Sequence, residues 1–176
     1  MTEAIKKNSI NIGIILGVIW ILCHVIMYSI DLKYFINFWL GLGLIFFGVI
    51  IAIVAVVKSK VLKGGFMTFR QAFTAFFITV ALAFAIQVAF DSILFNLIDP
   101  AAKEIVKEHY IDFNISMGQR AQLPAEKIKE QVEVIKNSNM YGFANLAQQY
   151  VFIMLLYTII GLIVAAAFKK TPTHEQ

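Results

Sequence analysis

The chain has 176 residues, of which 60% are hydrophobic and 15% are charged, and its mean hydropathy is +0.78. Soluble domains average about 45–50% apolar and about 25% charged residues, so this composition excludes an ordinary water-soluble domain. The formal net charge of +4 does not indicate nucleic-acid binding, because the basic residues stand in short groups at the ends of apolar runs, as in membrane proteins.

Apolar runs dominate the chain, and each is long enough to cross a bilayer as a helix, which takes about 20 residues. They cover residues about 10–30, 35–57, 73–98 and 146–168. None alternates polar with apolar residues as membrane β-strands do, and lipid offers the backbone no hydrogen-bond partners. We therefore predict an all-α fold, a four-helix transmembrane bundle that forms a single membrane domain over residues 1–176.

The first run follows Lys6 and Lys7, an arrangement also found in cleaved signal peptides. Such peptides have an apolar core of about 7–15 residues followed by a small-x-small cleavage site. This run is longer and no such site follows it, so we predict a retained first helix. Its only cysteine, Cys23, excludes an internal disulfide.

Between the second and third runs lies a basic segment, with Lys58, Lys60, Lys63 and Arg70. It predicts contact with anionic lipid head groups, although setting the topology alone would also explain it. With the other basic groups near both chain ends, it places both termini in the cytoplasm by the positive-inside rule. We predict a multi-pass protein of the cell inner (cytoplasmic) membrane.

The third run contains an acid, Asp91, with Gln87 one helical turn earlier. A charge near mid-bilayer costs roughly 2.5–3.5 kcal/mol, so Asp91 should face helices, a partner or water. At 1.5 Å per residue it lies roughly 10 Å inside the outer end of its helix, and His24 lies at nearly the same depth. We predict a polar intramembrane cluster of His24, Tyr28, Gln87, Asp91 and Tyr157, facing a shallow outward cavity.

An aspartate beside a histidine can relay protons or bind a cationic head group. Alternatively, Asp91 pairs with His24 or a tyrosine and only fixes the register of the helices. His24 has no second histidine one turn away, and no nucleophile, phosphate-loop or zinc motif is present in the sequence. We predict no catalytic residue, no metal and no cofactor.

Residues 99–145 form the one large polar segment, which we predict to be an extracytoplasmic helical insertion. Asp99-Pro100 is typical of a helix start, and we expect that helix to end near residue 113, before a break in 116–122. A second helix carries Ile128, Val132 and Ile135 on one face. We therefore predict a two-helix amphipathic cap between helices three and four, whose apolar stripe rests on the bundle, the membrane surface or a partner.

Small residues recur at helical spacing in every apolar run, which favours close helix packing in lipid. Packing within one bundle explains them most simply, and homodimerisation or docking on another membrane protein is the alternative. The predicted packing residues are Gly13, Gly17, Gly41, Gly48, Ala81, Ala85, Ala89, Gly161 and Ala165.

The segment "GGFMTFRQAF", 64–73, enters the third run with the pattern Gly-x-x-Thr-Phe-x-x-Ala-Phe at Gly65, Thr68, Phe69, Ala72 and Phe73. Together with "DPAAKE" and "LPAEKIKEQVE" in the polar segment, it resembles a family of small four-helix inner-membrane proteins of the Bacteroidota, known only as a domain of unknown function. The resemblance covers nearly the whole chain. It implies a bacterial cytoplasmic membrane but no reaction, ligand or catalytic residue.

These features favour a non-catalytic accessory or stabilising subunit of a bacterial envelope membrane complex. The alternative is a small proton-coupled or cation transporter that uses the Asp91 and His24 cluster, with a homodimer supplying further helices. An enzyme acting on lipid head groups would need a second carboxylate or a metal ligand beside Asp91. The expected partners are membrane lipids and another integral membrane protein or a second copy of the chain, and no nucleic acid.

Overall fold

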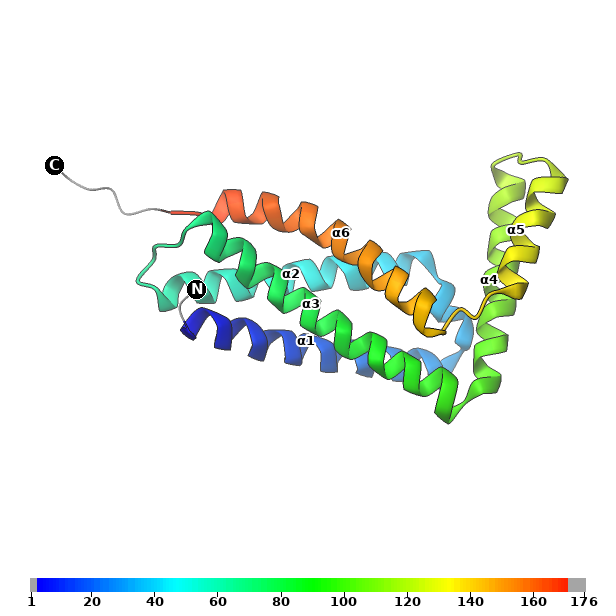
Figure 1. The fold of residues 1–176 in the computed structure, drawn as a ribbon, viewed down its shortest axis with the longest axis horizontal. Coiled ribbons are helices and arrows are strands. Elements are labelled where there is room, and N and C mark those ends of the chain that lie inside the picture. Colours follow the sequence, from blue (N-terminus) through cyan, green and yellow to red (C-terminus); the bar gives the residue numbers. More distant parts are fainter. Residues whose placement is uncertain (1–2, 171–176) are drawn as a thin grey trace.

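The computed structural model describes residues 3–170, and all of its long elements are helices (Figure 1). The elements in chain order are α1 (Glu3–Ile30), the 3₁₀ turn η1 (Leu32–Ile36), α2 (Phe38–Leu62), α3 (Phe69–Ile93), the π-helical turn η2 (Leu94–Ile98), α4 (Pro100–Arg120), α5 (Ala125–Asn137) and α6 (Phe143–Phe168). Four helices, with η2 counted as the end of α3, are long and apolar enough to cross a membrane. The predicted all-α architecture with four membrane helices is confirmed.

The four long helices run side by side, and the α4–α5 hairpin lies across one end of them (Figure 1). We call this the cap end. The start of α1 and the end of α6 lie together at the opposite, terminal end (Figure 1). The chain termini, which the sequence places in the cytoplasm, lie outside the described residues.

Several helix limits differ from those of the apolar runs that predict them, and the second helix begins at Phe38 rather than near residue 35. The first begins at Glu3 rather than near residue 10, and the third begins at Phe69 rather than near residue 73. A capping group sets the start of the third helix. Thr68 and Gln71 form a reciprocal capping box at the start of α3, because the first backbone N–H groups of a helix need acceptors from outside it.

The α2–α3 turn at the terminal end carries the basic residues that the sequence assigns to lipid head groups. Lys58 and Arg70 are exposed, and Lys60 and Lys63 are half-buried. The turn is held in place by paired backbone hydrogen bonds of 2.9 and 2.8 Å between Met67 and Lys170. The basic residues therefore gather at one end of the bundle.

Helix α3 contacts all three other long helices and forms the centre of the bundle. Glycines permit two of these approaches. A Cβ at Gly13 of α1 would lie 2.9 Å from the Thr79 carbonyl oxygen, and one at Gly161 of α6 would lie 2.8 Å from Phe76. Both distances are too short for any side chain, so these glycines serve packing inside the chain.

Three of the predicted packing residues do not pack inside the bundle. A Cβ at Gly41 would meet no atom within 4 Å, and Ala85 and Ala89 are exposed. The α3 face that enters the core instead carries Ala72, Ala75, Phe76, Thr79, Val80 and Ala83. The four-residue spacing of Ala85 and Ala89 predicts that they share one face of α3, but it does not say whether that face points into the bundle or outward.

The cap starts as expected, because the Asp99 side chain accepts a 3.0 Å hydrogen bond from Ala102 N–H and Pro100 opens α4. The expected end of α4 near residue 113 is wrong, since the helix continues to Arg120. Gly118 stays helical and lets α5 approach: a Cβ there would lie 2.8 Å from Ile128 Cγ1. The glycine taken as a helix break is therefore a contact point between the two cap helices.

Candidate functional site

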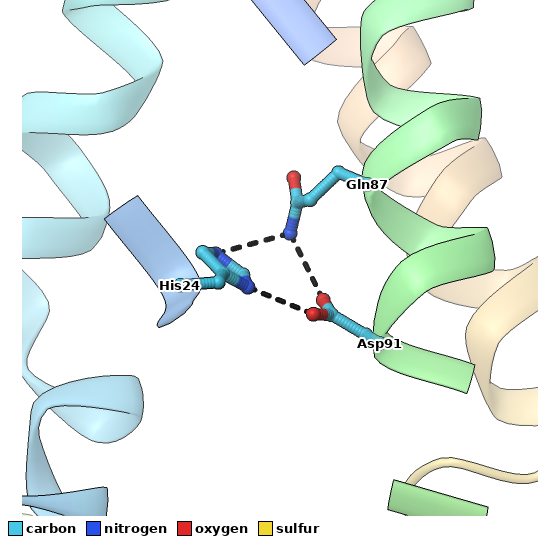
Figure 2. A network of polar contacts seen from close by, with 3 residues as sticks. All are labelled: His24, Gln87 and Asp91. Atoms are coloured by element: carbon cyan, nitrogen blue, oxygen red, sulfur yellow. Dashed lines mark hydrogen bonds and ion pairs between the residues drawn. The ribbon is translucent and has the colours of Figure 1, made fainter. Parts of the chain in front are cut away.

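Three polar side chains meet between α1 and α3 at the level of the last turns of α3 (Figure 2). His24 Nδ1 lies 2.8 Å from Asp91 Oδ1. Gln87 Nε2 lies 3.1 Å from Asp91 Oδ2 and 3.2 Å from His24 Nε2. We call these residues the polar triad. His24 and Asp91 are only 8% and 6% exposed, so each satisfies most of its hydrogen bonding within the triad.

The triad geometry selects one protonation pattern. Gln87 Nε2 has two N–H donors, and both acceptors near it, Asp91 Oδ2 and His24 Nε2, must offer lone pairs. His24 Nε2 is then unprotonated, and its Nδ1–H donates to Asp91 Oδ1. Every hydrogen bond is satisfied when His24 is neutral and Asp91 is ionised, which leaves the triad with a net charge of −1.

The triad forms the floor of a cavity of about 620 Å³ at the cap end. The bundle helices α1, α3 and α6 form its base and one side, and Tyr110 of α4, together with Ser138, Met140 and Tyr141, lines it from the cap. This volume lies within the range of roughly 300–1,000 Å³ that is typical of small-ligand pockets. A buried carboxylate is thus accessible from a space large enough for a small molecule.

The segment before α6 holds the cap over this cavity. Asn96 of η2 donates a 2.8 Å hydrogen bond to the Tyr141 carbonyl oxygen, and the Tyr141 ring stacks on Phe95 with 4.0 Å between centroids. Burial and, second, the negative charge of Asp91 raise the pKa of Tyr141. Its hydroxyl therefore stays protonated beside the cavity.

Two of the five residues predicted for the cluster have other partners. Tyr28 donates a 2.7 Å hydrogen bond to Asp99 Oδ2 and so ties α1 to the start of the cap. Tyr157 donates a 3.2 Å hydrogen bond to the Ile45 carbonyl oxygen of α2. Tyr28 shares a helix face with His24, but it lies one turn nearer the cap, so its hydroxyl reaches Asp99 instead of Asp91.

A smaller chamber of about 180 Å³ lies deeper in the bundle and shares His24, Gln87 and Phe84 with the cavity above it. Trp20 and Tyr157 line this inner chamber. Trp20 Nε1 is buried and has no hydrogen-bond partner among the described residues. An unsatisfied buried donor costs about 1–3 kcal/mol, so this indole N–H is a local cost to the stability of the bundle.

Below the chamber, large side chains fill the core. Leu16, Phe76 and Val80 are each fully buried between the helices. Nearer the terminal end, Asn8 donates hydrogen bonds of 3.1 and 2.9 Å to the Ala55 carbonyl oxygen and Ser59 Oγ. The polar triad is therefore approached from the cap end in this conformation.

The sequence reasoning missed the residues that make the cavity walls. Phe35 comes from η1, Tyr110 from α4 and Tyr141 from the turn before α6. Each lies in a different segment, and none follows a recognisable spacing relative to Asp91. The one signal in the sequence is the concentration of aromatic residues next to the polar segment, which does not say which of them meet.

A family model described as "Protein of unknown function (DUF4199)" matches residues 11–170, which is nearly the whole chain. No curated protein and no solved structure matches the chain. The comparisons therefore assign a family without assigning a reaction, a ligand or a partner.

Proposed function

This chain belongs to the DUF4199 family of proteins of unknown function, and we propose from its own geometry that it is a non-catalytic membrane protein that takes up a cation or a proton at Asp91. The observation that carries this proposal is the charge of the polar triad. His24 is neutral when all three hydrogen bonds are made, so the carboxylate has no compensating positive charge within the triad.

The cost of that charge favours uptake of a cation. An unpaired charge inside a bilayer costs at least roughly 2.5–3.5 kcal/mol, and a cation in the cavity would recover part of it. A proton recovers the same cost, because the Gln87 amide can turn its oxygen to accept a hydrogen bond from a protonated His24 Nε2. Other titratable groups near Asp91 are Tyr110 and Tyr141, which line the same cavity.

The direction of access follows from the positive-inside rule. The basic α2–α3 turn lies at the terminal end, which would face the cytoplasm of a bacterial cell, and the cap end would face outward. The carboxylate would then be loaded from outside. Impermeant maleimide on intact cells tests this orientation in a Cys23→Ser background: Gln119→Cys in the cap should be labelled, and Lys63→Cys in the turn should not.

Proton flux into reconstituted vesicles, followed with a pH-sensitive dye, tests the function itself. Asp91→Asn should abolish a flux that the unaltered protein supports. Asp31→Asn is the matched control, because Asp31 is half-buried and pairs with Lys33 at 2.8 Å outside the cavity. Equal fluxes in the unaltered protein and Asp91→Asn, or no flux and no cation binding at all, would refute the proposal.

A second candidate, an accessory subunit of an envelope membrane complex, is favoured by a groove between α1 and α2. The groove measures about 450 Å³ and is lined almost wholly by apolar side chains, including Met27, Ile30 and Trp39. A Cβ at Gly43 in this groove would meet no atom within 4 Å, so a partner helix could approach the α2 backbone closely.

The accessory role predicts a co-purifying membrane protein. Gly43→Leu should reduce the amount of that protein recovered in mild detergent, because the larger side chain would fill the groove. Phe46→Leu, an exposed change one turn away on the same helix, is the control and should leave recovery unchanged. A chain that always runs alone at its own mass would exclude this role.

A further inference from the structure

The walls of the cap-end cavity have an unusual composition. Five aromatic side chains surround the polar triad: Phe35, Phe84, Tyr110, Tyr141 and Phe152. The remaining polar groups are hydroxyls and amides, and Asp91 is the one ionised side chain among the lining residues. No lysine or arginine belongs to the described lining, so nothing in the walls supplies a positive charge.

We infer that this cavity binds an organic ammonium ion, either a free amine or the head group of a lipid. The inference rests on the proposed cation uptake and names the class of cation. Aromatic faces attract ammonium groups with about 0.5–2 kcal/mol each, most strongly where water is excluded. A carboxylate in a cavity lined by aromatic rings combines the two features that such a ligand requires.

The same walls disfavour hydrated metal cations. Calcium and magnesium take several oxygen ligands, usually with more than one carboxylate. Both oxygens of Asp91 already accept hydrogen bonds, from His24 and from Gln87. Each carboxylate oxygen keeps a further lone pair for an ammonium N–H, and a quaternary ammonium needs only the charge and the rings.

The position of the cavity allows both sources of ammonium. It lies at the cap end, between the hairpin and the bundle. Phe152, which lines the cavity from the apolar helix α6, is 73% exposed. A head group could enter from the lipid side, and a soluble amine could enter from water.

Tetramethylammonium binding to the protein in nanodiscs made only of phosphatidylglycerol is the direct experiment. Trp20 lines the chamber beneath the triad, so a Trp39→Phe background leaves it as the single fluorescent reporter. We expect a saturable signal, with affinity at least tenfold weaker in Asp91→Asn and several-fold weaker in Tyr110→Leu. The control Phe46→Leu should bind as the background protein does, and sodium chloride at equal ionic strength should not compete.

The source of the ligand is resolved with a second lipid. Nanodiscs that contain phosphatidylethanolamine should weaken tetramethylammonium binding if a lipid head group occupies the cavity, and should leave it unchanged if the ligand is a free amine. Either result supports ammonium binding. Tetramethylammonium affinity that is unaffected by Asp91→Asn and by Tyr110→Leu, or no binding in any nanodisc, overturns it.

The outcome for the broader proposal is read separately. Absent ammonium binding with a proton flux that depends on Asp91 would overturn the ligand class and leave the proposed function standing. Gel filtration and circular dichroism establish that each variant is folded. If Asp91→Asn fails this check, Tyr110→Leu decides, because it alters the cap wall without removing a buried charge.

Discussion

Gly48→Ala should destabilise the bundle, whereas Gly41→Ala on the same helix should not. A Cβ at Gly48 would lie 2.6 Å from Trp20 Cζ2 and 2.6 Å from Tyr157 Oη, and a Cβ at Gly41 would meet no atom within 4 Å. Trp20 and Tyr157 are 3% and 1% exposed. Both rings are packed between helices, so the added Cβ must displace one of them toward the inner chamber that they line.

The magnitude follows from three contributions. Overpacking of a filled core costs about 1–3 kcal/mol. Displacing Tyr157 would also break its hydrogen bond to the Ile45 carbonyl oxygen, which is worth about 0.5–1.5 kcal/mol. Replacing glycine by alanine inside a helix returns about 0.5–1 kcal/mol. The net loss for Gly48→Ala is about 2 kcal/mol, and Gly41→Ala should gain up to about 1 kcal/mol.

Thermal unfolding in a mild detergent measures the difference. For a chain of this size, 1 kcal/mol shifts Tm by roughly 2–4 °C, so Gly48→Ala should lower Tm by about 4–8 °C. Trp20 fluorescence should change in Gly48→Ala and stay constant in Gly41→Ala. Equal Tm values for the two variants would show that α2 does not approach α1 and α6 at Gly48, and the described geometry of the inner chamber would be wrong.

Three further predictions concern the triad and the cap. His24→Phe removes the donor to Asp91, so it should lower the free energy of unfolding by about 1–3 kcal/mol. A double-mutant cycle with Asp91→Asn should show a coupling energy of up to about 1.7 kcal/mol between the two side chains. Strictly additive losses of stability would contradict a direct hydrogen bond. Hydrogen bonds from Tyr28 and Ala102 lower the pKa of Asp99 below 3.8, so its stabilisation of α4 is fully present above pH 3.8 and is lost as the pH falls through the lowered value. Amide exchange in the first turn of α4 should accelerate over that acidic window and lose this pH dependence in Asp99→Asn; the same profile in both proteins would refute it. Gly118→Ala should push α5 away at Ile128 at a cost of about 1 kcal/mol. Amide exchange should then become faster in α5 and stay unchanged in α3. Unchanged exchange in both helices would contradict the close approach.

The membrane helices were predictable because the physical cause is local. A run of apolar residues such as 10–30 must leave water whatever its neighbours are, and a helix is the form that satisfies its backbone in lipid. The start of the cap was predictable for the same reason, since Asp99 and Pro100 act on the adjacent turn. Helix ends were less predictable, because polar residues such as those in 3–9 continue a helix without contributing to an apolar run.

The candidate site was partly predictable. Counting residues along a helix gives depth, and this put His24 and Asp91 at one level, where the structure joins them at 2.8 Å. Counting does not give rotation or reach. Tyr28 and Tyr157 were expected beside Asp91, but their hydroxyls bond Asp99 and the Ile45 carbonyl oxygen instead.

Sequence alone determined that this protein belongs in a bilayer, with four helices, one polar insertion and a buried acid that needs a neighbour. Only the tertiary structure decided which neighbours that acid has and what encloses it. The cavity walls come from η1, α3, α4, α6 and the turn before α6, and their meeting depends on how whole helices cross and turn. Hydropathy and helical periodicity act within one segment, whereas these contacts join side chains more than sixty residues apart, such as His24 and Asp91.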